Sequence, residues 1–155
     1  MKSFKRSLRA MGLIAALVMS PLAQAHDDAY LDTVTAPHGG QLRMAGGNHY
    51  ELVVAKDPAA AQDKPVTVYV TDHAGTPIPV AGASGQVTLL DGKTKLNVTL
   101  KPDGPNKLSG RGAYASGPTL KAVVKIKLAG QDEQQARFTP LAPRAGAAPN
   151  SGHSH

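Results

Sequence analysis

Apolar and polar side chains alternate over most of residues 37–140, and turn-forming residues interrupt the alternation at short intervals. The stretch "VTVYVT" places Val66, Val68 and Val70 on one face, and "TLKAVVKIKLAG" sets apolar side chains on one face against lysines on the other. A period of two residues is typical of half-buried β-strands. Roughly seven or eight short antiparallel strands of this kind predict a small all-β domain, a β-sandwich of the Ig-like or prealbumin-like type.

The first predicted hairpin joins "QLRMA" to "HYELVV", and its register depends on the length of the loop. A three-residue loop over 46–48 sets Met44 opposite Tyr50 and Arg43 opposite Glu51, which gives one apolar face and one face with an ion pair. A two-residue turn would mix apolar and polar side chains on both faces. Because burial of a single face specifies the register of a strand, we expect the three-residue loop.

A second hairpin is indicated by "QVTLLDGKTKLNVTLK". The dipeptide Asp91-Gly92 is a signal for a two-residue type I′ turn. Such a turn places Val87 opposite Leu96, within a face made of leucine and valine side chains.

The first residues have the composition of a secretory signal peptide. A basic region is followed by the apolar stretch "MGLIAALVM", which is too short to span a bilayer, and "AQA" offers a cleavage site after Ala25. No later stretch is apolar enough to cross a membrane. The sequence therefore predicts export to the periplasm and release as a soluble protein that begins at His26.

This cleavage site divides the chain into four parts. Residues 1–25 form the signal peptide, residues 26–36 are expected to form a short flexible segment, and residues 37–140 form the β-sandwich domain. Residues 141–155, "LAPRAGAAPNSGHSH", have little to bury and are expected to form a disordered tail.

Charge and cysteine content narrow the functional classes. The whole chain has 17 basic and 11 acidic residues and a net charge of +6, whereas the part after Ala25 keeps thirteen of the basic residues and a net charge of +2. No basic run with interleaved aromatic residues supports nucleic-acid binding. Since cysteine is absent, a metal site would use histidine, carboxylate or backbone ligands, which suit borderline ions such as Cu(II) or Zn(II) better than Cu(I).

His26 is the first candidate ligand. An amino-terminal histidine offers its α-amine and its ring Nδ1 to one ion, and a further imidazole would complete a site suited to Cu(II). This arrangement resembles the start of CopC-type copper carriers and of lytic polysaccharide monooxygenases. The simpler interpretation is that some residue must follow the cleavage site.

His38, His49 and His73 are further candidates, although each taken alone is explained as an exposed polar residue near a turn. Counting about seven residues along the predicted hairpin separates His38 from His49 by roughly 20 Å, too far for one ion. The next strand runs back toward His49 and ends at Asp72 and His73. We therefore expect His49 to lie beside His73, with Asp72 near them.

The sequence contains no arrangement typical of an enzyme. It has no cysteine nucleophile, no serine in a G-x-S-x-G turn, and few aromatic residues for a substrate-binding face. We therefore expect a protein that is not an enzyme. A copper monooxygenase remains a third option that would need His26 held against a second histidine on a flat face.

The ordered motifs "PHGG", "HYELVV", "VYVTDHAGTPIP" and "ARFTP" resemble the small amino-terminal β-domain of CzcB-like adaptor subunits in heavy-metal RND efflux systems. The resemblance covers roughly residues 36–139. It matches His38 to the histidine of the family's HGG motif and Glu51 to a glutamate in the following strand. It implies a periplasmic role in metal binding or transfer around an efflux pump, whose components would be partners.

Two functions remain open on the sequence alone. The first is a periplasmic accessory protein that buffers or transfers a divalent transition metal through a subset of His26, His38, His49, His73 and the carboxylates of Glu51 and Asp72. The alternative is a β-sandwich module that binds a protein partner and no metal.

Overall fold

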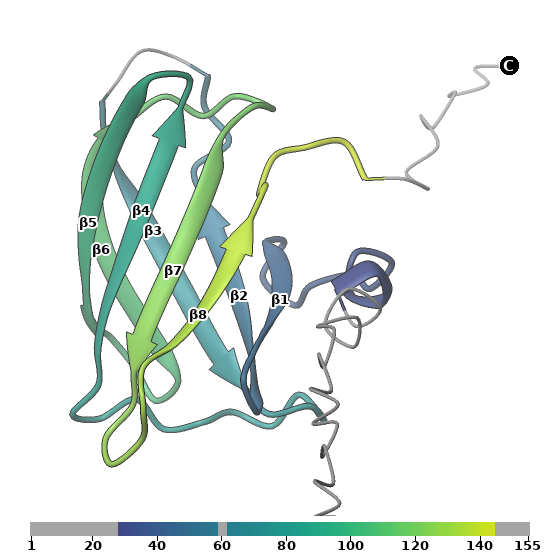
Figure 1. The fold of residues 1–155 in the computed structure, drawn as a ribbon, viewed down its shortest axis with the longest axis vertical. Coiled ribbons are helices and arrows are strands. Elements are labelled where there is room, and N and C mark those ends of the chain that lie inside the picture. Colours follow the sequence, from purple (N-terminus) through teal and green to yellow (C-terminus); the bar gives the residue numbers. More distant parts are fainter. Residues whose placement is uncertain (1–27, 59–61, 145–155) are drawn as a thin grey trace, which may run out of the picture.

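The computed structural model describes residues 28–58 and 62–144, which form an antiparallel β-structure (Figure 1). The described strands are β1 (Gln41–Ala45), β2 (Asn48–Val54), β3 (Gln62–Thr71), β4 (Ser84–Asp91), β5 (Thr94–Pro102), β6 (Lys107–Tyr114), β7 (Lys121–Lys127) and β8 (Gln134–Phe138). Their order in space is β1-β2-β3-β6-β5-β4-β7-β8, and every pairing is antiparallel. The predicted all-β class is confirmed.

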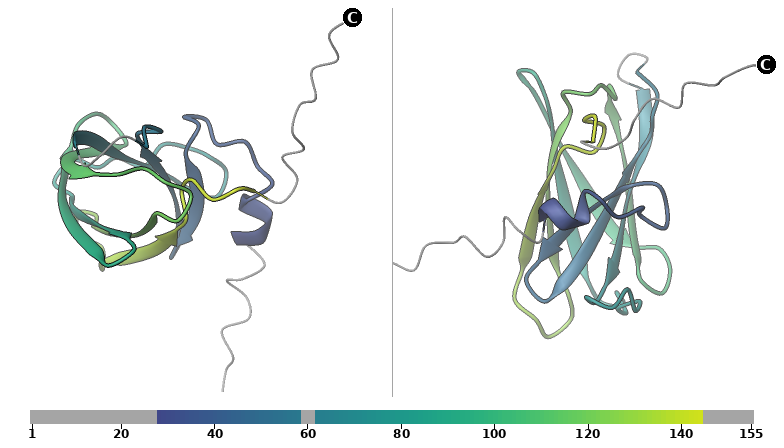
Figure 2. Two further views of the ribbon diagram at one scale, coloured as in Figure 1. Left: turned by 90° about the horizontal axis from the view of Figure 1, so that it is seen from above. Right: turned by 90° about the vertical axis from the view of Figure 1, so that its right-hand side faces the viewer.

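The strands form two curved layers that meet in a nearly closed ring when seen from above (Figure 2). The layers join where β5 crosses to β6, and only Lys101–Ser109 and Pro102–Leu108 pair there. Gly110 permits this close crossing, because a Cβ atom at that position would lie 2.3 Å from the carbonyl oxygen of Thr99. On the other side of the ring β1 approaches β8.

Alternating side chains from every strand fill the space between the two layers. The predicted inward apolar residues of β3, β7 and β8 are buried, and the lysines of β7 are exposed. Lys64 of β3 is the exception, because it is buried at an inward position. The fully buried side chains include Tyr50, Leu52, Leu89, Leu100, Leu108, Leu120 and Ile126. Burial of apolar area on this scale is the main force that holds a disulfide-free domain together.

The predicted register of the first hairpin is wrong. Met44 pairs with His49 and Leu42 pairs with Glu51, so the loop is a two-residue turn, with Gly46 at a φ of 60°. The prediction assumed that one face of β1 is exposed to solvent. In the structure one face of β1 is buried and the other is half-buried. A contrast between a buried face and an exposed face therefore does not determine the register of β1 against β2.

The second hairpin forms with a shifted register. Leu89 pairs with Leu96 and Val87 pairs with Val98, so the predicted pairing of Val87 with Leu96 is wrong by two residues. The turn therefore falls one residue later than Asp91-Gly92. A slip of two residues keeps every side chain on its predicted face, because side chains alternate with a period of two.

Residues 28–38, which we call the strap, lie against β1 and β2 outside the ring (Figure 2). A helical turn begins at Asp28, and Leu31 and Ala36 are buried. The part of the predicted flexible segment that the structure describes is therefore packed. Leu141 also packs against the core, so the predicted disordered tail does not begin at residue 141.

Residues 1–27, which include the predicted signal peptide and His26, lie outside the described residues, as do residues 145–155 with His153 and His155. Within the described ranges, no helix has the length and apolarity needed to cross a membrane.

Candidate functional site

A pocket of about 260 Å³ lies between the strap, the outer face of β1–β3 and the turn after β3. It is lined by every histidine of the described residues, namely His38, His49 and His73, together with Glu51. Its other lining residues are mainly apolar: Tyr30, Leu31, Val34, Pro37, Leu42 and Ala74 among them. We call it the histidine pocket.

His49 and His73 meet at one end of this pocket. His49 pairs with Thr71, the last residue of β3, and the turn that follows returns His73 to the same place. The two imidazole rings stand edge to face, with centroids 4.9 Å apart and planes at 81°. The predicted neighbourhood of His49 and His73 is confirmed.

The ring separation suits a shared metal ion. An imidazole nitrogen lies about 2.0–2.1 Å from zinc, so each ring centroid would lie roughly 3.2 Å from a shared ion, and a tetrahedral angle would separate the centroids by about 5 Å. The observed separation is 4.9 Å, but the two rings stand edge to face, so one imidazole would have to rotate to direct both nitrogens at one ion. Among residues 28–58 and 62–144, no group of three or more histidine or carboxylate side chains is arranged to hold one ion.

Asp72 shapes the turn that carries His73. Its Oδ1 accepts hydrogen bonds of 2.8 Å from the backbone N–H groups of Ala74 and Thr76. The hydrogen bond from the Thr76 backbone is the largest cause that holds the pKa of Asp72 below its usual value. Asp72 is absent from the lining of the histidine pocket, so its carboxylate positions His73 and does not face the same space.

Glu51 holds His38 at the other end of the pocket. Its Oε1 accepts the backbone N–H groups of His38 at 2.8 Å and Gly40 at 3.0 Å, and its Oε2 lies 2.7 Å from His38 Nδ1. The residue is only 3% exposed. Two backbone N–H groups and one imidazole nitrogen therefore surround this carboxylate.

The contact with Glu51 also orients the imidazole of His38. In the tautomer that donates from Nδ1 to this carboxylate, the neutral ring keeps its lone pair on Nε2. The ring of Tyr69 stacks on the imidazole, with centroids 3.5 Å apart and planes at 2°. A histidine held in this way by a carboxylate has the outer-shell support that metal-ligating histidines commonly have.

The predicted separation of roughly 20 Å between His38 and His49 is wrong. His38 contacts Glu51, and Glu51 lies only two residues from His49 on β2, a distance of about 7 Å. The prediction extended the strand straight back to His38. The chain instead turns at Gly39, with a φ of 73°, and folds His38 over the outer face of β2.

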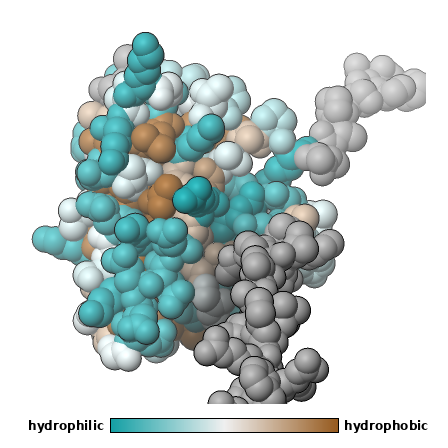
Figure 3. Space-filling model, viewed as in Figure 1, coloured by the Kyte–Doolittle hydropathy of each residue, from teal (hydrophilic) through white to brown (hydrophobic). Residues whose placement is uncertain are grey.

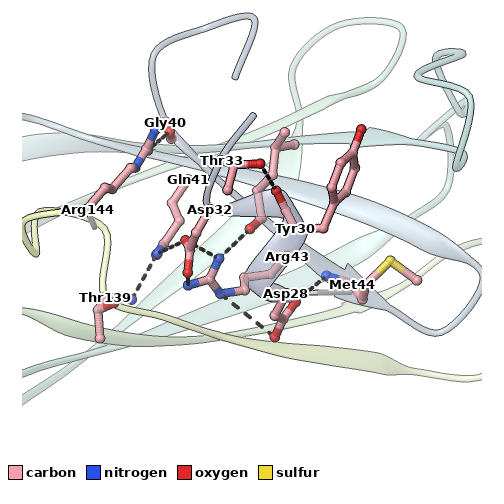
Figure 4. A network of polar contacts seen from close by, with 11 residues as sticks. Asp28, Tyr30, Asp32, Thr33, Gly40, Gln41, Arg43, Met44, Thr139 and Arg144 are labelled. Carbon is pink, nitrogen blue, oxygen red and sulfur yellow. Dashed lines mark hydrogen bonds and ion pairs between the residues drawn. The ribbon is translucent and has the colours of Figure 1, made fainter. Parts of the chain in front are cut away.

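An ion-pair network fixes the strap over β1 (Figure 4). The guanidinium of Arg43 donates to both carboxylate oxygens of Asp32, at 2.7 and 3.1 Å, and its Nε lies 3.8 Å from Asp28. Asp28 also accepts the backbone N–H of Met44 at 3.2 Å. The network holds Tyr30 and the rest of the strap in place as one wall of the pocket.

Asp32 is the acidic centre of this network. Burial raises its pKa, but the hydrogen bonds and the positive charge of Arg43 outweigh that effect, so the pKa of Asp32 lies below its usual value. The side-chain amide of Gln41 donates a hydrogen bond of 3.3 Å to the same carboxylate, and its oxygen accepts the backbone N–H of Thr139 at 2.8 Å. The strap, β1 and the segment after β8 are thus connected through a few polar side chains.

Neither the strap nor Tyr69 was predicted to belong to the site. Tyr69 occupies an outward position of β3, which normally indicates solvent exposure. Its stack on His38 depends on the turn at Gly39 and Gly40, and this glycine pair was the available signal. A Cβ atom at Gly40 would lie 2.4 Å from the carbonyl oxygen of Leu52, so the loop approaches β2 closely there.

Comparisons with known proteins leave the function open. No protein-family model matches the chain, and no curated protein matches it. A DUF4426 family protein from Pseudomonas aeruginosa aligns in three dimensions with a TM-score of 0.44 and 17% sequence identity, over 63% of this chain and 92% of that chain.

Proposed function

We propose that this protein binds a divalent transition-metal ion, Cu(II) or Zn(II), between His49 and His73. It acts in the periplasm as an accessory protein that buffers the ion or transfers it, in connection with heavy-metal efflux. The observation that supports this proposal best is the pair of imidazole rings 4.9 Å apart in a pocket lined by His38 and Glu51 as well.

A two-imidazole site suits transfer better than permanent storage. Structural zinc sites use four protein ligands, and such sites hold the ion tightly. A site with two protein ligands leaves coordination positions for water or for a donor from another molecule. An ion held in this way exchanges readily, which is what a buffer or a transfer protein requires.

The experiment is a calorimetric titration with Zn(II) and Cu(II) of the untagged protein, exported from the full-length chain with its own amino-terminal segment. We expect about one equivalent to bind, and His49→Ala or His73→Ala to abolish that binding. Thr71→Val is the matched control, because Thr71 lines the same pocket and valine keeps its shape. Equal binding by the two histidine variants and the control would contradict the proposal.

The surface around the pocket favours one alternative, a module that binds a protein partner without metal. Tyr30 is 68% exposed, and among the described residues it is the large hydrophobic side chain that faces solvent. It stands beside apolar residues of the pocket, and exposed apolar patches commonly mark protein interfaces. On the face drawn in Figure 3, hydrophobic areas lie between hydrophilic ones. Partner binding that survives His49→Ala and a chelator but fails in Tyr30→Ser would favour this alternative.

A further inference from the structure

We propose that the outer face of the layer formed by β5, β4, β7 and β8 binds to an anionic phospholipid surface. We call it the cationic face, because its outward strand positions carry five positive side chains: Lys95, Lys121, Lys125, Lys127 and Arg137. The inference goes beyond the proposed metal binding and does not depend on it, since the histidine pocket lies on the outer face of the other layer.

The pairing of the strands places these side chains on one side of the sheet. Leu90 pairs with both Lys95 and Lys121, and directly paired residues of antiparallel strands point to the same face. Arg137 pairs with Val123 in the same way. The alternate residues of β7 share this face, because the residues between them are buried. The cations thus extend roughly 14 Å across four strands and about 20 Å along β7.

The charges of this face are mostly not paired with carboxylates. Lys125 lies 3.6 Å from Glu133, which precedes β8. In the part of the chain that the structure describes, no carboxylate forms an ion pair with the other four cations. The outward positions of these four described strands also hold no aspartate or glutamate. Positive charge therefore accumulates on this face.

The layer of β1, β2, β3 and β6 shows the opposite arrangement. Its cations and those of its connections pair with carboxylates, as in Arg43 with Asp32, Lys64 with Asp57, Lys107 with Asp103 and Arg111 with Asp63. The chain after Ala25 has a net charge of only +2, so the charge is distributed unevenly between the two layers. An uneven distribution of this kind turns the cationic face toward an anionic surface.

Protection of a sheet edge does not explain these lysines. Lysine side chains on edge strands prevent unwanted pairing with another chain. Three of the five cations belong to β7, which pairs with β4 on one side and with β8 on the other. An inner strand has no free edge to protect, so its lysines call for another explanation.

The side chains of the face favour a lipid surface over a protein or a nucleic acid. The cores of protein interfaces are enriched in aromatic residues and arginine and are depleted in lysine. Single-stranded nucleic acids are commonly held by bases that stack on aromatic side chains. The cationic face has four lysines, one arginine and no exposed aromatic side chain among its described strand residues. Clusters of about four to eight lysine or arginine residues are typical of segments that bind anionic lipids.

A recess at one end of the face adds an apolar contact. Its volume is about 270 Å³, and its lining includes Lys121 and Arg137 together with Leu90 and Val123. Leu90 and Val123 are half-buried at outward positions. Arg43 also lines the recess, but its guanidinium is engaged by the strap. Surfaces that combine apolar side chains with lysine and arginine bind at the boundary between lipid headgroups and acyl chains.

The test is sedimentation of the untagged protein, exported from the full-length chain, with lipid vesicles. One set of vesicles contains phosphatidylcholine alone, and the other contains phosphatidylcholine and phosphatidylglycerol in equal parts. The variant of the cationic face combines three substitutions on β7: Lys121→Gln, Lys125→Gln and Lys127→Gln. Each of these lysines is exposed, so the substitutions leave the core intact.

Two further variants make the result specific to this face. The matched control, Lys56→Gln with Lys101→Gln and Lys107→Gln, removes the same charge elsewhere, since Lys101 and Lys107 line a pocket beside β6. Glu133→Gln removes the carboxylate beside Lys125. Its expected effect is stronger binding, which a loss of folding cannot produce.

We expect binding to the vesicles with phosphatidylglycerol only, and we expect added salt to weaken it. The three substitutions on β7 should lower the affinity roughly 100-fold, since each lysine near an anionic lipid surface contributes about fivefold. The control should lose much less, because its lysines face away and salt screens charges beyond about 8–10 Å. Glu133→Gln should raise the affinity.

Three results would overturn the inference and leave the proposed metal binding standing, because metal binding is measured without vesicles. The first is equal binding to both kinds of vesicle, and the second is an equal loss in the two lysine variants. The third is binding of the unaltered protein to polyglutamate but not to vesicles, with loss in the β7 variant, which would assign the face to an acidic protein partner. A protein with His49→Ala and His73→Ala should bind vesicles as the unaltered protein does.

Discussion

Glu51 binds His38 at two points at once, through the backbone N–H and through the ring Nδ1. The carboxylate is almost entirely buried, and it also accepts the N–H of Gly40. One side chain of β2 therefore determines the path of the loop before β1 and the orientation of an imidazole in the histidine pocket.

Glu51→Gln should destabilise the protein by about 1–3 kcal/mol, because the amide nitrogen of glutamine would face N–H donors inside a buried site. The measurement is the free energy of unfolding from a denaturant titration. Glu133→Gln is the control, since Glu133 pairs with Lys125 at 3.6 Å on the exposed surface and such pairs contribute little. Equal losses in the two variants would contradict the role given to Glu51.

Gly40→Ala should lower the thermal stability, because the added Cβ atom would lie 2.4 Å from a backbone oxygen and 2.9 Å from Cγ2 of Val53. Overpacking of this kind costs about 1–3 kcal/mol. Gly47→Ala provides a matched comparison, because nothing lies within 4 Å of a Cβ atom at Gly47. A Gly40→Ala protein as stable as Gly47→Ala would show that the loop does not need its close approach to β2.

Asp32 should make the stability dependent on acidic pH. Its pKa in the folded protein is lower than the ordinary value of 3.8, so the folded state holds the proton less tightly than the unfolded state. The stabilising contribution is fully present above that value and is lost as the pH falls from about 3.8 through the lower folded pKa. Asp32→Asn should flatten the unfolding free energy in this window. An unchanged acid profile in the variant would rule out this contribution.

Metal binding should weaken in mild acid if imidazoles are the ligands. Protons compete for the ring nitrogens below about pH 6, so the Zn(II) affinity at pH 5.5 should be lower than at pH 7.5, and binding at the lower pH should release protons. Calorimetry in buffers of different ionisation enthalpy measures both quantities. An affinity that stays constant over this range would indicate ligands other than histidine.

The strands were predictable because their pattern reflects local burial. From β3 to β8, one face meets the core and the other meets water, so alternation alone assigns the inward residues. The position of His73 beside His49 followed from the same logic, because an antiparallel return of β3 delivers the two residues to one end of the sheet. Metal binding by this pair stays a prediction.

Two of the wrong predictions concern residues that lie beside the strap. The register of the first hairpin depended on the assumption of one exposed face for β1, and Arg43 is in fact buried in its pair with Asp32. No local pattern reveals that residues eleven positions apart form this pair. The predicted distance from His38 to His49 was wrong for a related reason. It assumed that the strand continues straight back to His38, whereas the chain turns at Gly39.

The connection of Gln41 to Asp32 and to Thr139 has a mechanical consequence. One amide side chain links the strap to the segment after β8, and Arg144 is attached to the neighbouring Gly40. Force applied to the two ends of the described chain would therefore act on these side-chain contacts before it acted on the hydrogen bonds between the strands. The strap and the last residues would peel away together, and the paired strands from β2 to β7 would bear the tension only afterwards.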